Sequence, residues 1–103
     1  MAKPIVLSHQ ASADRKQILE YWITRNRSNT YSIKLDRIFR ENFEILSSYP
    51  KLGRLLGIKE IRALVVRDYL FAYQETETNV EIITIWDTRQ DPKKLETILE
   101  TKL

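Results

Sequence analysis

Apolar residues recur three and four positions apart in two segments of the first half of the chain, residues 13–25 and 30–48. That spacing places them on one face of a helix. Ser12 and Asp14 can cap the first helix, and Pro50 ends the second one. Because the polar link between the helices is short, we expect them to pack as an antiparallel hairpin.

The second half of the chain alternates apolar and polar positions instead, which indicates strands with two different faces. The alternation covers residues 61–66, 69–73 and 80–86. Arg67-Asp68 and residues 75–79 supply short turns between these segments. The three strands should therefore form an antiparallel meander.

One short element precedes the two helices, and another follows the three strands. Ile5-Val6-Leu7 predicts a strand, and Asp91-Pro92 predicts the N-cap and first position of a short C-terminal helix. We therefore predict one α+β domain over residues 1–103, in which a small antiparallel sheet packs on an α-helical hairpin. That sheet contains the N-terminal strand and the three-stranded meander, and the short helix follows it.

The composition excludes several classes of site. The chain has 103 residues with 43% apolar content and no cysteine, so it has no disulfide framework and no thiolate metal site. His9 is the single histidine, which makes a zinc site improbable. We expect no metal and no cofactor. No apolar run is long enough to cross a bilayer, so we expect a cytoplasmic protein with no membrane partner.

Charge is distributed unevenly, although the net charge is only +3. Residues 51–67 contain five basic side chains against the single acid Glu60, and residues 68–91 contain six acids against the single base Arg89. We expect one basic and one acidic surface, or else solvated charges on strand edges. The mild basicity gives little support for nucleic-acid binding, and we expect no sequence-specific DNA binding.

Candidate binding residues lie where strands end. Arg89 follows Trp86-Asp87 at the exit of the last strand, where it can hold an anion or a partner. Alternatively it forms an ion pair with Asp87 or Asp91 that orders the turn. Arg62 is either a functional cation or an edge charge. Trp86 is either buried or part of a contact surface.

Two tyrosines on the middle strand face the same side. Tyr69 and Tyr73 are separated by four positions, so they project from one face of the sheet. We expect core packing with the hydroxyl groups at the rim, and a platform for stacking a substrate is the alternative.

Taken in order, these pieces resemble the RelE/ParE superfamily of bacterial toxins. The resemblance covers essentially the whole chain, and its specificity lies in the joint order of pieces that are individually weak. After one strand and a helical hairpin come Tyr49-Pro50-Lys51-Leu52-Gly53-Arg54, Ile61-Arg62, Tyr69-x-x-x-Tyr73 and Trp86-Asp87-x-Arg89-x-Asp91-Pro92. Members are the toxic halves of type II toxin–antitoxin pairs. The resemblance therefore implies a cognate antitoxin protein as a partner.

The superfamily divides by target. RelE-like members cut messenger RNA on the ribosome without a metal, and ParE-like members are understood to inhibit DNA gyrase. Metal-free cleavage needs a base, cations and an acid around the phosphate. The nucleases commonly carry an arginine after the first tyrosine of the middle strand, where this chain has Leu70, and no tyrosine or histidine follows Tyr73. The chain is thus nearer the ParE-like branch.

We therefore expect a toxin that binds a protein target such as DNA gyrase and is neutralised by its antitoxin. The expected target-binding residues are Arg54, Arg62, Arg67, Trp86 and Arg89. One alternative is a ribosome-dependent endoribonuclease that uses Arg54, Arg62 and Arg89 as catalytic residues. Another is a non-toxic adaptor with the same fold.

Overall fold

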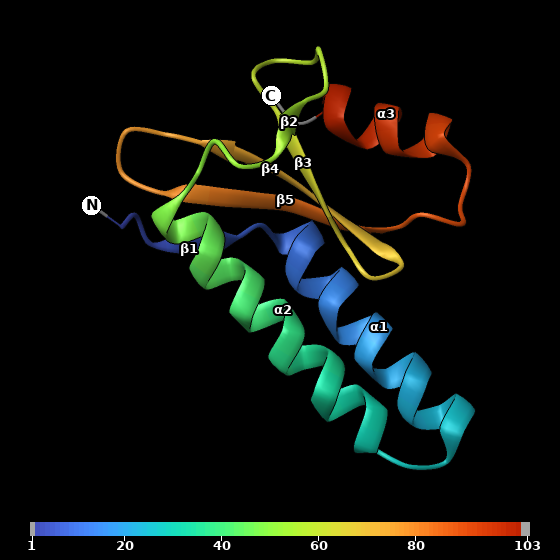
Figure 1. Cartoon of the computed structure of the whole chain (residues 1–103). Helices are drawn as coiled ribbons and strands as arrows, with labels where there is room; N and C mark the ends of the chain where they lie inside the picture. Colours follow the sequence, from blue (N-terminus) through green and yellow to red (C-terminus); the bar gives the residue numbers. More distant parts are fainter. Residues whose placement is uncertain (1, 102–103) are drawn as a thin grey trace.

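A computed structural model describes residues 2–101, which form three helices and a five-stranded sheet (Figure 1). The elements follow the order β1 (Ile5–Leu7), α1 (His9–Asn26), α2 (Thr30–Ser48), β2 (Arg54–Leu55), β3 (Arg62–Val66), β4 (Tyr69–Glu75), β5 (Val80–Asp87) and α3 (Pro92–Thr101). The predicted α+β class is confirmed, and so are the helical hairpin, the meander and the C-terminal helix.

The strands of the sheet lie in the order β1-β5-β4-β3-β2. β3, β4 and β5 form the predicted antiparallel meander. β1 pairs with β5 in parallel, so the sheet is mixed and not wholly antiparallel. The two-residue strand β2 adds to the outer edge of β3 and was not predicted. Runs of two or three residues show no periodicity that would reveal a pairing or its direction.

The two faces of the sheet carry separate apolar clusters, because successive side chains of a strand point to opposite faces. The hairpin-side cluster contains Ala11, Leu35, Phe39, Phe43, Leu46, Val66, Tyr69, Phe71, Tyr73, Val80, Ile82 and Ile85. The α3-side cluster contains Ile61, Ala72, Ile83 and Leu99. Figure 1 shows the hairpin and α3 on opposite sides of the sheet, which agrees with these two clusters.

The first helix begins at His9. The sequence had predicted a start near residue 13, so that prediction was wrong by about one turn. The N-cap of this helix is Ser8, whose hydroxyl oxygen accepts the backbone N–H of Ala11 at 3.0 Å. The same hydroxyl donates to the carbonyl oxygen of Ile83 at 2.6 Å, so this cap is fixed to β5. Asp14 consequently lies inside the helix, and its carboxylate is available for another role.

The other two helices begin where the sequence predicted. α2 covers the predicted residues 30–48, and α3 begins at Pro92. The carboxylate of Asp91 accepts the backbone N–H of Lys93 at 3.0 Å, as an N-cap does. Within residues 2–101, no helix combines the length and apolar character that crossing a bilayer requires.

Candidate functional site

The five predicted binding residues lie at two different ends of the sheet. Arg67, Trp86 and Arg89 lie where β3 ends and β5 leaves the sheet, and we call this the exit end. Arg54 and Arg62 lie at the opposite end, together with Lys51, and we call this the basic end. Asp87 pairs with Tyr69, and Arg62 pairs with Tyr73, four positions further along β4. That separation is about 13 Å along the strand, so the two groups do not converge on one site.

At the basic end, Arg62 binds backbone atoms of the loop that precedes β2. Its Nη1 donates to the carbonyl oxygen of Gly53 at 2.7 Å and to that of Lys51 at 3.3 Å. Arg54 is exposed and pairs with Ala63, the neighbour of Arg62. Because side chains alternate along a strand, Arg54 and Arg62 project to opposite faces.

The hydroxyl of Tyr73 is buried against the same loop. Tyr73 is fully buried, and its Oη donates to the carbonyl oxygen of Pro50 and accepts the N–H of Gly53, both at 2.8 Å. Burial raises the pKa of Tyr73. A Cβ atom at Gly53 would lie 2.6 Å from this hydroxyl oxygen, so only glycine fits there. The prediction of core packing is confirmed for Tyr73, but the hydroxyl lies inside and not at the rim.

One acid near the basic end, Glu75, is already paired. Glu75 forms an ion pair with Lys3 at 2.9 Å. The hydrogen bond from Lys3 lowers the pKa of Glu75, and the charges of Lys51 and Arg62 lower it further. Three cations thus act on this one carboxylate.

At the exit end, Arg89 forms an ion pair with Asp87. Arg89 Nε donates to Asp87 Oδ1 at 2.9 Å, and Arg89 Nη2 donates to Asp87 Oδ2 at 2.8 Å. The backbone N–H of Arg89 also donates to Asp87 Oδ1. This pairing lowers the pKa of Asp87 and raises that of Arg89. The ion-pair alternative is thus present, yet the Arg89 side chain is still 55% exposed.

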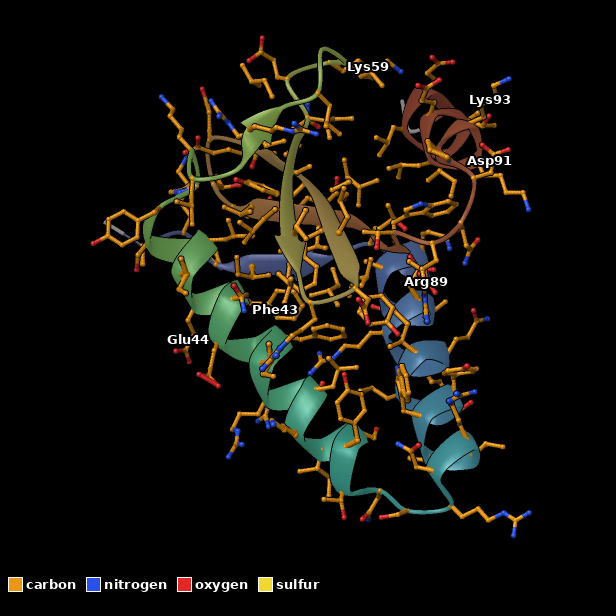
Figure 2. All side chains as sticks on the ribbon, turned by 45° about the vertical axis from the view of Figure 1, so that its right-hand side comes forward. Phe43, Glu44, Lys59, Arg89, Asp91 and Lys93 are labelled. Carbon is orange, nitrogen blue, oxygen red and sulfur yellow. The ribbon has the colours of Figure 1, made fainter. Side chains whose placement is uncertain are left out.

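A cavity of about 540 Å³ opens beside Arg89. It lies where β1 has ended, between α1, the last residues of β5 and α3. Its lining residues are Gln10, Asp14, Gln17, Ile18, Tyr21, Tyr69, Ile85, Trp86, Asp87, Arg89, Gln90 and Ile98. Figure 2 shows Arg89 next to the N-terminal half of α1, and Asp91 and Lys93 further out at the start of α3.

Inside this cavity, Asp14 accepts hydrogen bonds from the part of β5 that lies beyond the end of β1. Its Oδ2 accepts the backbone N–H of Ile85 at 3.0 Å and the hydroxyl of Thr84 at 2.5 Å. Its Oδ1 accepts a hydrogen bond from Gln10 at 2.8 Å. Sequence reasoning treated Asp14 only as a capping residue and missed this role. The available signal was its position four residues before Ile18, on the same apolar face of the helix.

The aromatic residues of the exit end are largely buried. Trp86 is 9% exposed and pairs with Leu70, so its ring lies on the face that α3 covers. Tyr69 is 2% exposed, and its hydroxyl oxygen accepts a hydrogen bond from Trp22 Nε1 at 2.9 Å. Burial raises the pKa of Tyr69. Arg67 is exposed in the β3–β4 turn and does not line the cavity.

Comparison with known proteins identifies the family. The family described as ParE toxin of type II toxin-antitoxin system, parDE, matches residues 5–92. The chain belongs to this ParE toxin family. The match includes both ends of the sheet and all five predicted binding residues. No curated protein matches the chain.

A solved structure supports the fold of this ParE-family toxin. It is titled "Chromosomal ParDE TA system from P. aeruginosa" and contains a chain that superposes with a TM-score of 0.72. The match covers 84% of the present chain and 96% of that chain, at 14% sequence identity. At so low an identity the likeness concerns the fold alone.

The geometry limits what the basic end of this ParE-family toxin can do chemically. Arg62 and Tyr73 supply a guanidinium group and a hydroxyl group at this end. Both already bind the loop of residues 50–53, and the hydroxyl is buried. Arg54 remains exposed, and an exposed cation alone supplies phosphate binding without proton transfer.

Proposed function

We propose that this ParE-family toxin arrests growth in the cytoplasm by binding a protein at the exit end of its sheet. DNA gyrase is our first candidate for that target, and a cognate antitoxin neutralises the toxin. The observation that carries the proposal is an ordered but exposed arginine beside an open cavity, which the 47% exposed Tyr21 also lines. Arg89, Tyr21, Tyr69 and Trp86 all line that cavity.

An arginine with aromatic neighbours is typical of the residues that dominate protein–protein contacts. Arg89 is already held by Asp87, so binding a partner costs it less rotamer entropy than a free side chain would lose. Its guanidinium remains 55% exposed and can still donate hydrogen bonds from its other N–H groups.

The proposed antitoxin contact lies at the other end of the molecule. Three apolar side chains in or just before β2 are more than half exposed, namely Tyr49 at 68%, Leu52 at 55% and Leu55 at 52%. Exposed apolar surface of this kind commonly marks an interaction site. An antitoxin segment that covered it would bury this surface without occupying the exit end.

A ribosome-dependent endoribonuclease is the alternative function. The engagement of Arg62 and Tyr73 with the loop of residues 50–53 argues against it, because the reaction would have to release both groups. Leu70, at the position where the nucleases commonly carry arginine, faces the α3-side cluster and contributes no charge.

Two assays with the purified protein separate these functions. The first measures supercoiling of relaxed plasmid by gyrase, and the second measures cleavage of messenger RNA on stalled ribosomes. We expect inhibition of supercoiling and intact message, together with growth arrest on induction that co-expressed antitoxin relieves. Cleaved message with normal supercoiling would show the nuclease function instead. Induction without growth arrest would indicate the non-toxic adaptor.

A further inference from the structure

The cavity at the exit end contains a carboxylate with no counter-ion. The three hydrogen-bond donors around Asp14 are the Gln10 amide, the Thr84 hydroxyl and the Ile85 backbone N–H, and all of them are neutral. None of the ion pairs formed within residues 2–101 includes Asp14. A partly buried charge left in this state is costly unless an opposite charge joins it.

The other charged groups around the cavity cancel each other. Asp87 and Arg89 line the cavity and form an ion pair with each other. α3 contributes only the apolar Ile98, and the remaining polar lining groups are neutral amides and hydroxyls. Two carboxylates against one guanidinium leave the cavity with a net negative charge, which belongs to Asp14.

The walls of the cavity favour a flat cation over a compact one. Of the three aromatic lining residues, Tyr21 is 47% exposed and offers its ring to a docking group, whereas Tyr69 and Trp86 are largely buried. A guanidinium group stacks on aromatic faces and donates forked hydrogen bonds to a carboxylate. A carboxylate has about four acceptor sites, and Asp14 uses three of them, so it can still accept a bond.

We infer that this cavity takes an arginine side chain from the protein that docks at the exit end, with Asp14 as its counter-ion. The inference rests on the proposed function, since it names the chemistry of the partner at the same site. Asp14 acts as a specificity-determining residue: it is fixed to β5 before the partner arrives, so a neutral side chain in the same place leaves its charge unpaired. The partner segment should therefore present arginine next to apolar residues that cover the exposed ring of Tyr21.

The test is an NMR titration of the ¹⁵N-labelled chain with blocked arginine, N-acetyl-arginine amide. The backbone amide of Ile85 and the indole N–H of Trp86 are the reporter signals, because the first bonds to Asp14 and the second belongs to the cavity wall. Blocked citrulline has nearly the same shape without the charge and is the matched ligand control. We expect saturable shifts with arginine and about tenfold weaker binding of citrulline.

Two variants locate the effect. Asp14→Asn keeps an oxygen that can accept the Ile85 N–H and should weaken arginine binding about tenfold. Glu20→Gln removes the same charge from an exposed position of α1 that does not line the cavity, and binding should stay unchanged. If Asp14→Asn does not fold, the relative affinities of the wild-type chain for blocked arginine and blocked citrulline decide the question.

Three results would overturn the inference: no saturable shift with blocked arginine, equal binding of citrulline, or the same reporter shifts on titration with acetate. The last would mean that Arg89 makes the cavity an anion site. The titration contains neither gyrase nor ribosomes. A chain that leaves gyrase active can therefore still pass this test, and a chain that inhibits gyrase can fail it.

Discussion

The two ends of the sheet both carry arginine and tyrosine, and they use these residues in different ways. At the basic end, Arg62 and Tyr73 donate to backbone carbonyl groups of the preceding loop. At the exit end, Arg89 pairs with the neighbouring Asp87 beside an open cavity. The same residue types thus fix a loop in one place and border an accessible space in the other.

This difference shows why charge alone is a poor guide to a binding site. The basic end has the greater excess of positive charge, but its best-placed polar groups are already satisfied within the molecule. The exit end has a smaller total charge, yet its Asp14 carboxylate has no counter-ion in the described part of the chain. The two ends therefore differ in the sign of the charge that is left for a partner: exposed cations such as Arg54 at the basic end, and the Asp14 carboxylate at the exit end.

The largest expected effect comes from Gly53→Ala at the basic end. The added Cβ would lie 2.6 Å from the Tyr73 hydroxyl oxygen and 2.7 Å from the carbonyl oxygen of Ala63. We expect a loss of about 3 kcal/mol in the free energy of unfolding, measured by urea denaturation.

Gly57→Ala is the matched control. Gly57 has a positive φ of 79° and open space around it. Alanine there should cost only the backbone strain, about 1 kcal/mol. Equal losses at the two glycines would contradict the tight loop packing that distinguishes the basic end.

Tyr73→Phe should have the next largest effect. It removes the buried hydroxyl and leaves the Gly53 N–H and the Pro50 carbonyl without this partner, at a cost of about 2 kcal/mol. Burial raises the pKa of Tyr73 above its usual 10.0, so the unfolded tyrosine ionises first. The advantage of the wild type is full below pH 10.0 and falls as the pH rises above it.

Tyr69→Phe sharpens this comparison at the exit end. It removes one hydrogen bond, from the partly buried Trp22, and should cost about 1 kcal/mol. Urea denaturation at neutral pH measures both tyrosine variants. A larger loss for Tyr69→Phe than for Tyr73→Phe would reverse the assigned roles of the two hydroxyl groups.

The smallest effect is expected for Asp87→Asn. Arg89 lowers the pKa of Asp87 below its usual 3.8, so the carboxylate stabilises the fold above that pH. This contribution is lost as the pH falls through the lowered pKa. The stability difference between the wild type and Asp87→Asn should therefore be small at neutral pH and shrink in acid. Thermal unfolding across an acidic pH series measures it, with the exposed Glu77→Gln as control.

The long elements of the fold could be predicted from the sequence, because each shows several periods of its pattern. α2 matched its predicted bounds, and the meander strands lie where alternation placed them. β1 pairs in parallel and β2 escaped notice, since such short runs do not encode a partner. The start of α1 was missed because Ser12 and Asp14 offered capping side chains as good as that of Ser8.

The candidate site could be predicted only in part. Arg89 and Trp86 were found because both stand at the end of a clearly periodic strand, and both line the cavity. Asp14 was not found, because its role depends on β5, seventy residues further along the chain. Likewise, the sequence could not show that Arg62 would turn toward the loop carbonyl groups, because that contact arises only when β2 pairs with β3.

The central claim is that the exit end is the binding end. The most direct test measures how strongly the Arg89→Gln and Arg54→Gln variants inhibit supercoiling by gyrase. Both changes remove one exposed arginine charge, and they do so at opposite ends of the sheet. We predict that Arg89→Gln raises the concentration for half-inhibition about tenfold or more, whereas Arg54→Gln leaves it nearly unchanged. A loss of inhibition with Arg54→Gln and full inhibition with Arg89→Gln would contradict the account.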